Sequence, residues 1–431
     1  HPGGGRREGE DTPGAVTTTA DVVVVGAGIA GVSAAYHLAV GQGISSVVLV
    51  DPRPPLSLTS DKSTECYRNW WPDRAMVGLM NRSIDIYEQL AGETEFGFNH
   101  NGYLFVTGER EKVTEMQRQA RAIHPMGASA DVLDRTALLD TYPFIAEEAA
   151  GALFVPRAGW FRAQDLGLWM LDRARDAGAT MIKASVDALV PGRVTLDDGS
   201  VISTGSTVIA AGPMSSEVAE LAGLDLPLFS ELHLKVAFRD HLGIIPRDAP
   251  MTIWSDTQTI DWSEDEKAGL LDLGRDDLIG EMPIFCHFRP EGGAESPYIV
   301  ALWEYHDLVI EPTWPLPDDP LYPEVVLRGL TTMVPGLAAY HDRLPESFVD
   351  GGYYTKTPEN RPLIGPSGLD RVHLLTGMSG FGVMVSAGAA DLLAAHIAGK
   401  PLPDYADAFL LSRYDDPDYS ANLANIESGQ L

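Results

Sequence analysis

The chain has 431 residues, of which 45% are hydrophobic and 21% charged, so it exceeds one ordinary domain and is too apolar for a disordered protein. Its formal net charge of −30 excludes nucleic acid and anionic membranes as expected partners, because polyanions would repel this surface. Two cysteines, Cys66 and Cys286, cannot build a disulfide framework, which favours a reducing compartment and a cytoplasmic location.

Residues 1–20 have no apolar core and are expected to form a flexible leader. The apolar run 22–40 is interrupted by glycines, so no membrane span is expected. Histidine, cysteine and acidic residues do not recur at metal-ligand spacing, and no metal site is predicted.

The segment 21–51 predicts a strand, a turn, a helix and a second strand that together bind a nucleotide. The apolar run Val22–Val25 is typical of a strand buried on both faces, and three glycines follow it in the G-x-G-x-x-G spacing. These are Gly26, Gly28 and Gly31. They provide a tight turn, room for a pyrophosphate against bare backbone, and close packing of the helix on the strand.

The helix expected from Ile29 to Val40 is rich in small residues, so it can lie close to the sheet. Ile29 and Ala30 stand at its N-terminus, which favours phosphate groups. The second strand, 47–50, ends on Asp51, a carboxylate placed to accept a hydrogen bond from a ribose hydroxyl. The complete unit predicts a site for an adenine dinucleotide.

Helical spacing and glycine or proline boundaries predict further helices after this unit. They are expected at 75–90, 111–123, 163–177, 323–333 and 382–398. Apolar runs predict strands at 102–107, 151–155, 180–190, 193–196, 207–210, 232–238, 284–288, 298–303 and 372–375. The acidic segment 255–281 is predicted to be a solvated surface insertion, with a substrate lid or a subunit contact as the alternative.

Three separated motifs carry a resemblance to a known family. They are GAGIAG at 26–31, STVIAAGPMSS at 206–216, and RPLIGPSGLDRVHLLTGMSGFGVMVSAGAADLLAAHIAG at 361–399. With these motifs the chain resembles the family of glycine oxidase, monomeric sarcosine oxidase and D-amino acid oxidase, which also holds dimethylglycine dehydrogenase. The resemblance implies an α/β fold, α+β overall, in which a Rossmann-type FAD-binding domain is interleaved with a mixed-sheet substrate-binding domain.

The family fold also implies how the chain is divided. The FAD-binding domain is expected at 21–95, 150–228 and 350–415, and the substrate domain at 96–149 and 229–349. Residues 416–431 would form a C-terminal tail after them.

The resemblance implies that the cofactor is FAD. It also implies that residues from three parts of the chain contact FAD. Beyond the first unit, the expected contacts are Pro52, Arg53, Lys62, Ser63, Thr64, Cys66, Val186, Ala211, Gly212, Arg361, Gly377, Ser379, Gly380, Phe381, Gly382, Val383 and Met384. A helix beginning at about Gly382 would stabilise negative charge on the flavin through its dipole and free N–H groups. The alternative is that the glycines of this turn only permit a tight buried bend.

FAD is expected to be held without a covalent bond, with a link through Cys66 as the alternative. In dimethylglycine dehydrogenase, a histidine at the corresponding position is bonded to the flavin 8α carbon. A thiolate could attack that carbon if Lys62 or Arg68 lowered the pKa of Cys66, whereas the neighbouring Glu65 would raise that pKa.

Departures from sarcosine oxidase decide which substrate residues are expected. Arg68 stands where that enzyme has the arginine that pairs with a substrate carboxylate, and Met384 stands where it has an assisting lysine. Leu302 replaces the lysine thought to activate oxygen, so slow reaction with oxygen is expected, and the electron acceptor is oxygen or another molecule. The other candidates for the site are Glu65, Tyr305, His306 and Lys356. Each has a structural alternative as an ion-paired or packed side chain.

The expected function is FAD-dependent oxidation of a C–N bond in a small amine or amino acid. A hydride would pass from the carbon beside nitrogen to flavin N5, and the resulting imine would hydrolyse. Two alternatives stay open: an FAD-binding partner subunit without catalysis, and a flavoenzyme for C–C desaturation or hydroxy-acid oxidation. The sequence does not fix the substrate or the oligomeric state.

Overall fold

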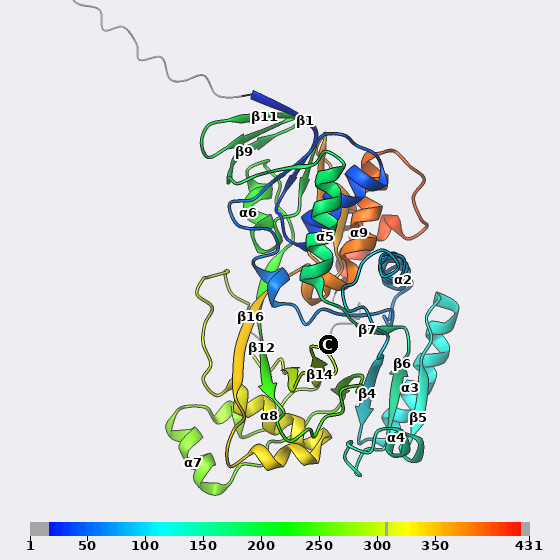
Figure 1. The fold of residues 1–431 in the computed structure, drawn as a ribbon, viewed down its shortest axis with the longest axis vertical. Coiled ribbons are helices and arrows are strands. Elements are labelled where there is room, and N and C mark those ends of the chain that lie inside the picture. Colours follow the sequence, from blue (N-terminus) through cyan, green and yellow to red (C-terminus); the bar gives the residue numbers. More distant parts are fainter. Residues whose placement is uncertain (1–16, 307–308, 424–431) are drawn as a thin grey trace, which may run out of the picture.

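The structure, a computed structural model, describes residues 17–306 and 309–423. Two eight-stranded sheets and a small two-stranded sheet organise these residues. Figure 1 shows the first sheet with its helices in the upper half of the molecule and the second sheet in the lower half. Blue, green and orange segments meet around the first sheet, so parts far apart in the sequence build one layer there (Figure 1).

The first sheet is built on the strand that opens the nucleotide unit. This strand, β1 (Thr17–Val25), lies between β11 (Val201–Ile209) and β2 (Val47–Val50) and pairs with both in parallel. The order across the sheet is β17-β18-β11-β1-β2-β8, and a hairpin of β9 and β10 extends it from β11. The remaining strands are β8 (Thr180–Ile182), β9 (Val186–Val190), β10 (Arg193–Leu196), β17 (Leu363–Pro366) and β18 (Val372–Thr376).

Alternating side chains of β1 pack against two different covers. The helices involved are α1 (Ile29–Tyr36), α2 (Arg74–Leu90), α5 (Ala163–Asp176), α6 (Ser215–Glu220) and α9 (Gly382–Ile397). Val22 and Val24 share a core with α1, α2, α5 and α9, whereas Val23 and Val25 share one with α6 and the β9–β10 hairpin. Because both faces are covered, the strand carries apolar residues at every position, which explains its unbroken valine run.

One helix is more apolar than the sequence analysis expected. The stretch Ser379–Ile397, which contains α9, is long and apolar enough to cross a membrane by length and composition, so the expectation that none would reach this limit is wrong. Within the protein, 67% of its most apolar window is buried. The cause of its composition is its place in the core, where it packs against α1 and α2.

The second sheet has the order β16-β12-β15-β14-β13-β4-β6-β5. Its strands are β4 (Tyr103–Thr107), β5 (Asp131–Asp134), β6 (Gly151–Val155), β12 (Phe229–Arg239), β13 (Met251–Trp254), β14 (Cys286–Glu291), β15 (Tyr298–Leu302) and β16 (Ser347–Lys356). Neighbouring strands are antiparallel, apart from β13 and β4, which are parallel.

Three of the helices and the small sheet adjoin the second sheet. The helix α8 (Tyr322–Met333) packs on the second sheet in a core of its own, while α3 (Arg110–Ile123) and α4 (Arg135–Thr141) contact β5 and β6. The small sheet pairs β3 (Cys66–Arg68) with β7 (Ala158–Trp160), between the two large sheets in Figure 1.

Several expected boundaries differ from the observed ones. Residues 17–20 of the expected leader belong to β1, where they pair with β11, and residues 1–16 lie outside the described part of the chain. The segment 180–190 forms two strands instead of one, because β8 pairs with β2 and β9 with β10. The expected tail contains a short helix, α10 (Pro417–Ala421), and its residues 424–431 are also outside the description.

Sheet membership crosses two of the expected domain boundaries. The expected division puts 151–155 and 350–356 with the FAD-binding segments, whereas β6 and β16 pair within the second sheet. The reason is that β16 is one long strand that runs from the second sheet toward the first, so its residues serve both halves (Figure 1). The division of the chain into two domains itself stays a prediction.

The acidic segment 255–281 contains a capped helix, α7 (Glu264–Asp272). The Ser263 hydroxyl accepts from the Glu266 N–H at 3.3 Å, while the Glu266 carboxylate accepts from the Ser263 N–H at 2.7 Å. This reciprocal pair satisfies two backbone donors at the start of the helix.

Candidate active site

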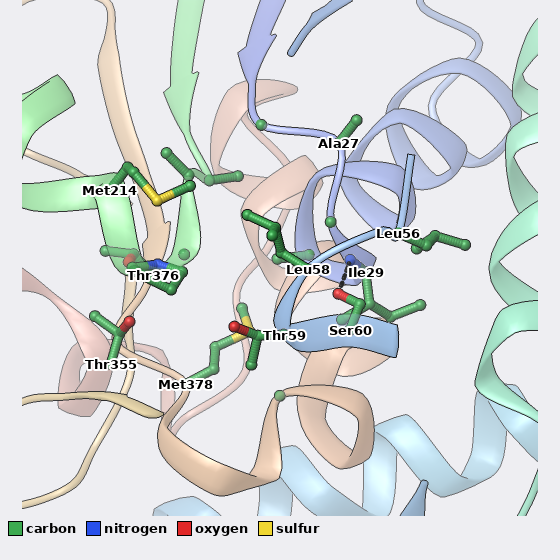
Figure 2. Close-up of a pocket in the computed structure, with 18 of the residues that line it drawn as sticks. Ala27, Ile29, Leu56, Leu58, Thr59, Ser60, Met214, Thr355, Thr376 and Met378 are labelled. Carbon is green, nitrogen blue, oxygen red and sulfur yellow. Dashed lines mark hydrogen bonds between the residues drawn. The ribbon is translucent and has the colours of Figure 1, made fainter. Parts of the chain in front are cut away.

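A cleft opens where three parallel strands of the first sheet end. Gly26 follows β1, Ala210 follows β11 and Thr376 ends β18, and all three line this cleft of about 120 Å³. Figure 2 shows Ala27 and Ile29 on one side of the cleft, with Met214, Thr355 and Thr376 across from them. Ligands of open α/β sheets bind at this edge of the strands, and we call it the dinucleotide cleft.

The glycines of the first turn permit two close approaches of backbone to backbone. Gly26 has φ +108°, and a Cβ there would lie 2.3 Å from the Ala210 carbonyl oxygen. A Cβ on Gly31 would lie 1.9 Å from the Gly26 carbonyl oxygen. Larger residues cannot fit at either position, so the turn and the helix are locked together as the spacing predicts.

Asp51 connects the two turns that border the cleft. One carboxylate oxygen accepts from the Ala27 N–H at 2.9 Å, and the other accepts from the Arg53 N–H at 2.8 Å. The side chain also lines the cleft. It therefore holds the glycine turn in place, a role that the expected ribose contact did not include.

The N-terminus of α1 provides donors for an anion. Its N-cap residue, Gly28, makes no side-chain cap hydrogen bond, and the Ile29 N–H donates to the Ser60 hydroxyl at 2.9 Å, the dashed line in Figure 2. A Cβ on Gly28 would lie 3.3 Å from the same hydroxyl, so the missing side chain leaves the backbone accessible. The Ile29 N–H is already used by Ser60, so the fit of a dinucleotide's pyrophosphate to this helix N-terminus rests on the close approach that the bare Gly28 backbone allows.

A second cavity, of about 60 Å³, continues from the cleft, and we call it the inner chamber. It shares lining residues with the cleft, namely Ile29, Thr59, Ser60, Ser379 and Gly382. The helix α9 begins at Gly382, and its N-cap, Phe381, makes no side-chain cap hydrogen bond. This helix therefore points its positive N-terminal end at the chamber, which fits an anionic ring.

A third cavity, of about 50 Å³, adjoins the chamber through Leu302, Tyr354 and Gly380, which line both. We call it the substrate pocket. Its lining also includes Thr64, Cys66, Arg68, Trp71, Tyr103, Met251, His287, Glu304, Phe381 and Met384. A Cβ on Gly380 would lie 2.3 Å from the Tyr354 ring, so the absent side chain makes the room for that ring at the junction.

Arg68 is a buried cation in the substrate pocket. Its guanidinium lies over the rings of Trp71 and Tyr103, at 4.7 and 5.6 Å from their centroids, and Nε donates to the Trp70 carbonyl at 3.2 Å. Burial lowers the pKa of Arg68, although Tyr103 partly offsets this effect. The aromatic rings fix the plane of the guanidinium, which favours bidentate binding of a carboxylate.

A charged cluster on β12 borders the chamber, and the sequence analysis missed most of it. His233 stacks on Tyr354 at 3.8 Å, and its two ring nitrogens lie 2.8 Å from a Glu304 oxygen and 3.2 Å from a Glu231 oxygen. Burial lowers the pKa of His233, but the two carboxylates outweigh it, so the net shift is upward. Lys356, one of the expected candidates, pairs with Glu231 at the far end of this cluster.

Lys235 is a further buried cation that lines the chamber. Its ammonium donates to the Ser63 carbonyl at 3.0 Å, and burial lowers the pKa of the group. A signal for these residues was present in the sequence, because Glu231, His233 and Lys235 alternate along β12 and so share one face of the strand.

The expected FAD contacts divide by location. Those that line the cleft or the chamber are Gly26, Gly28, Ile29, Ala30, Asp51, Arg53, Lys62, Ser63, Ala211, Gly212, Gly377, Ser379, Gly380, Gly382 and Val383. Those placed in the substrate pocket instead are Thr64, Cys66, Phe381 and Met384. Sequence analysis did not single out Leu58, Thr355, Thr376 and Met378, which line the cleft from segments distant in the chain.

Four other expected contacts are not among the residues that line the three cavities, and their contact with FAD stays a prediction. Gly31 packs α1 on the turn, and Pro52 follows Asp51 in the loop beside the cleft. Val186 packs beside the core under β9 and β10. Arg361 pairs with Asp73 at 3.2 Å.

Three candidates for catalysis have structural partners outside the substrate pocket. Glu65 accepts from the Ala163 N–H at the start of α5, at 2.8 Å, and lies 3.7 Å from Arg289. Tyr305 and His306 both bond to Asp319, at 3.2 and 2.8 Å. The carboxylate of Glu65 is therefore bonded to the start of α5, and the polar groups of Tyr305 and His306 are bonded to Asp319. These are the groups that a substrate would need.

Cys66 lies in the substrate pocket rather than in the chamber. The thiol is buried and donates to the Thr64 carbonyl at 3.3 Å. Burial raises the pKa of Cys66, although Arg289 partly opposes this effect. A raised pKa disfavours the thiolate that a covalent bond to the flavin requires, which supports non-covalent FAD.

Comparison with known proteins agrees with this geometry. The family described as FAD dependent oxidoreductase matches residues 21–396. The chain belongs to this family. Its cofactor is therefore FAD, and the bare helix N-terminus at Gly28, the open turn at Gly212 and the uncapped start of α9 fit that molecule.

Two curated relatives illustrate how far the similarity extends. Sarcosine oxidase subunit beta of an Arthrobacter species is 26% identical over 254 residues, which cover 52% of this chain and 62% of that protein. Mitochondrial dimethylglycine dehydrogenase of Mus musculus is 24% identical over 417 residues, which cover 92% of this chain and 45% of that protein. The chain thus spans less than two thirds of the length of these relatives.

Solved structures show the same fold. L-proline dehydrogenase from P. horikoshii has a TM-score of 0.76 at 22% identity, covering 93% of this chain and 99% of that one. Glycine oxidase from Geobacillus kaustophilus has a TM-score of 0.74 at 17% identity, covering 92% and 99%. The FAD dependent oxidoreductase therefore has the mixed α/β fold, with parallel and antiparallel sheets, that the resemblance implied.

Proposed function

We propose that this FAD dependent oxidoreductase oxidises the C–N bond of an amino acid or a related carboxylated amine. The observation that carries this proposal is the substrate pocket, in which Arg68 and Glu304 line one small cavity beside the inner chamber. A cation and an anion held in one pocket complement the carboxylate and the ammonium of a zwitterion. When bound, FAD accepts the hydride from the carbon beside nitrogen.

Two side chains would orient the substrate. Arg68 would bind the carboxylate, with its guanidinium plane fixed by Trp71 and Tyr103. Glu304 would hold the ammonium, and its own orientation is set by His233 at 2.8 Å. Together they would hold the substrate carbon at the junction with the chamber.

His287 would remove the proton that keeps the amine positively charged. Its Nδ1 donates to the Phe285 carbonyl at 2.6 Å, since a carbonyl only accepts, so the lone pair resides on Nε2. Burial lowers the pKa of His287, which keeps the ring neutral and able to accept a proton at neutral pH. The apolar side chains of Met251 and Met384 would exclude water from this transfer.

An anaerobic screen tests the proposal. The FAD-loaded protein is mixed with matched pairs, L-alanine with ethylamine and sarcosine with dimethylamine, and loss of the flavin absorbance band is followed. We expect the carboxylated member of each pair to bleach the flavin faster than its partner does. No bleaching by any amine or amino acid would refute the proposed oxidation.

Arg68→Met provides the residue-level test. Because a charged hydrogen bond contributes about 1.5–3 kcal/mol, the variant should weaken substrate binding by roughly 10–100-fold, and Arg68→Lys by less. An amine without a carboxylate should bind the variant as it binds the wild type. An unchanged Kd for the carboxylated substrate would remove Arg68 from the site.

The electron acceptor, location and partners also belong to this proposal. Leu302 lies at the junction of chamber and pocket and has no charge to stabilise reduced oxygen, which supports a slow reaction with oxygen. The buried ammonium of Lys235 lines the chamber and could stabilise that negative charge, which supports a faster reaction. Reoxidation by air, compared between wild type and Lys235→Met, separates oxygen from another acceptor. A relative named as a subunit of sarcosine oxidase supports partner subunits, and the cytoplasmic location stays a prediction.

A further inference from the structure

A much larger cavity adjoins the substrate pocket on the side of α3. It has a volume of about 530 Å³, against about 50 Å³ for the substrate pocket, and we call it the outer cavity. Arg68 and Trp71 line both cavities, so a ligand that extends from one into the other passes along these two side chains.

The outer cavity has a mostly apolar wall built by separate elements. The loop after β3, the strands β4 and β6, and the helix α3 contribute to it. Its apolar side chains include Trp70, Phe105, Met116, Ile123, Leu153 and Phe285. Of these, Phe105, Met116, Ile123 and Leu153 are buried even though they border a cavity.

One wall residue has a strained backbone. Phe285 has φ +71°, a conformation that a bulky side chain rarely adopts, and its N–H is fixed by the Trp254 carbonyl at 2.8 Å. Such strained conformations are concentrated at ligand sites. The carbonyl oxygen of Phe285 accepts the hydrogen bond from His287, which lines the substrate pocket. Phe285 therefore shapes both cavities.

The charged groups at the rim of the outer cavity are already paired. Lys112 lies 2.8 Å from Asp256 and 3.2 Å from Glu109, while Glu115 pairs with Arg118. The rim therefore offers little unbalanced charge to a polar ligand. The inner end carries the buried cation Arg68, next to apolar and aromatic surface.

We propose that the outer cavity binds an aromatic or comparably bulky apolar body of the substrate, whose carboxylate reaches Arg68. This inference rests on the proposed function and names the substrate class: amino acids with large apolar side chains or N-substituents. A cavity of about 150 Å³ is enough to take up benzene, so the outer cavity has room for such a group and the substrate pocket does not. The reacting carbon then lies in the substrate pocket, and the apolar body extends past Trp71.

Binding of unreactive carboxylates tests this inference without relying on turnover. The FAD-loaded protein is titrated with acetate and with 3-phenylpropanoate in an isothermal titration calorimeter. Because the phenyl group would leave water for an apolar wall, 3-phenylpropanoate should bind at least tenfold more tightly than acetate. Equal affinities for the two acids would overturn the inference.

Two glutamines of α3 provide a matched pair of variants. Both are exposed on this helix, but Gln119 lines the outer cavity and Gln117 lies outside that lining. Gln119→Trp should fill the cavity and cut the affinity for 3-phenylpropanoate about tenfold while leaving acetate unchanged, and Gln117→Trp should change neither. An equal effect on both acids, or no effect of Gln119→Trp, would place the phenyl group elsewhere.

The outcome is separable from that of the amine oxidation test. If amino acids bleach the flavin but 3-phenylpropanoate binds no better than acetate, the oxidation stands and the bulky substrate class is wrong. If no amine bleaches the flavin while the phenyl preference and its loss in Gln119→Trp are observed, the outer cavity stands and the proposed reaction is wrong.

Discussion

Asp51 illustrates how one side chain serves two parts of the site. Its position at the end of a strand predicts a contact with the ribose, and the structure shows it bonded to the backbone of both turns beside the cleft. A carboxylate that holds the glycine turn would contribute to FAD binding indirectly, by keeping the backbone from Ala27 to Gly28 in place.

Asp51→Ala should therefore weaken FAD binding by roughly 1.5–3 kcal/mol, about 10–100-fold in Kd. The measurement is fluorescence quenching as FAD is added back to the apoprotein. Asp51→Asn retains one acceptor oxygen and should show the smaller loss. A Kd for Asp51→Ala within about twofold of the wild type would mean that the turn does not depend on this carboxylate.

His233 makes stability depend on pH. Its net raised pKa means that its stabilising contribution is complete below the unfolded value, about 6.5, and is lost as pH rises through the folded value. The hydrogen bond from His233 lowers the pKa of Glu231 to about 2. The contribution of ionised Glu231 to stability is therefore complete above pH of about 4.5 and is lost as pH falls toward 2.

The Tm difference between wild type and His233→Gln should therefore be larger at pH 5.5 than at pH 8.5. Differential scanning calorimetry of the FAD-loaded proteins measures it. The exposed His124 provides a control, since His124→Gln removes a histidine without this cluster. A Tm difference that grew from pH 5.5 to 8.5 would contradict the raised pKa of His233.

At the scale of elements, the contact of α1 with the glycine turn leaves no room for a side chain at Gly31. The missing side chain of Gly31 allows the helix to reach the Gly26 carbonyl. This close contact packs the strand, the turn and the helix into one unit. The strand β16 plays the corresponding part on the other side, because its residues line the cleft, the chamber and the pocket.

Gly31→Ala should lower Tm by at least about 5 °C and abolish tight FAD binding, because a Cβ there would lie 1.9 Å from a backbone oxygen that cannot move aside cheaply. Gly269→Ala is the matched control. Gly269 lies exposed within α7 with open space around it, so alanine there should leave Tm unchanged or raise it slightly. Equal effects of the two substitutions would show that the close approach at Gly31 is unimportant.

At the scale of the whole molecule, the net charge of −30 opposes the compact state through self-repulsion. Raising NaCl from about 10 mM to about 500 mM should therefore raise Tm, since the Debye length falls from about 30 Å to a few Å. Sucrose at matched osmolality controls for general solute effects. A steady fall of Tm across this range would mean that attractive ion pairs outweigh the repulsion.

The sequence by itself determined the nucleotide unit and the identity of the cofactor. The strand Val22–Val25, the three glycines and Asp51 lie within one βαβ unit, in which Asp51 bonds the Ala27 N–H and Gly31 packs on Gly26. Local spacing is sufficient there, because the turn and the helix N-terminus are formed by the same short segment that the motif spans.

Only the tertiary structure decided the substrate side. Glu304, His287 and Arg68 come from three strands or the loops after them, and nothing in their local sequence says that they line one pocket. Glu65 and His306 are equally polar in the sequence, yet an N–H at the start of α5 and the carboxylate of Asp319 use them structurally. Which polar groups stay available to a substrate depends on pairings between residues far apart in the chain, and these form only when the sheets pack.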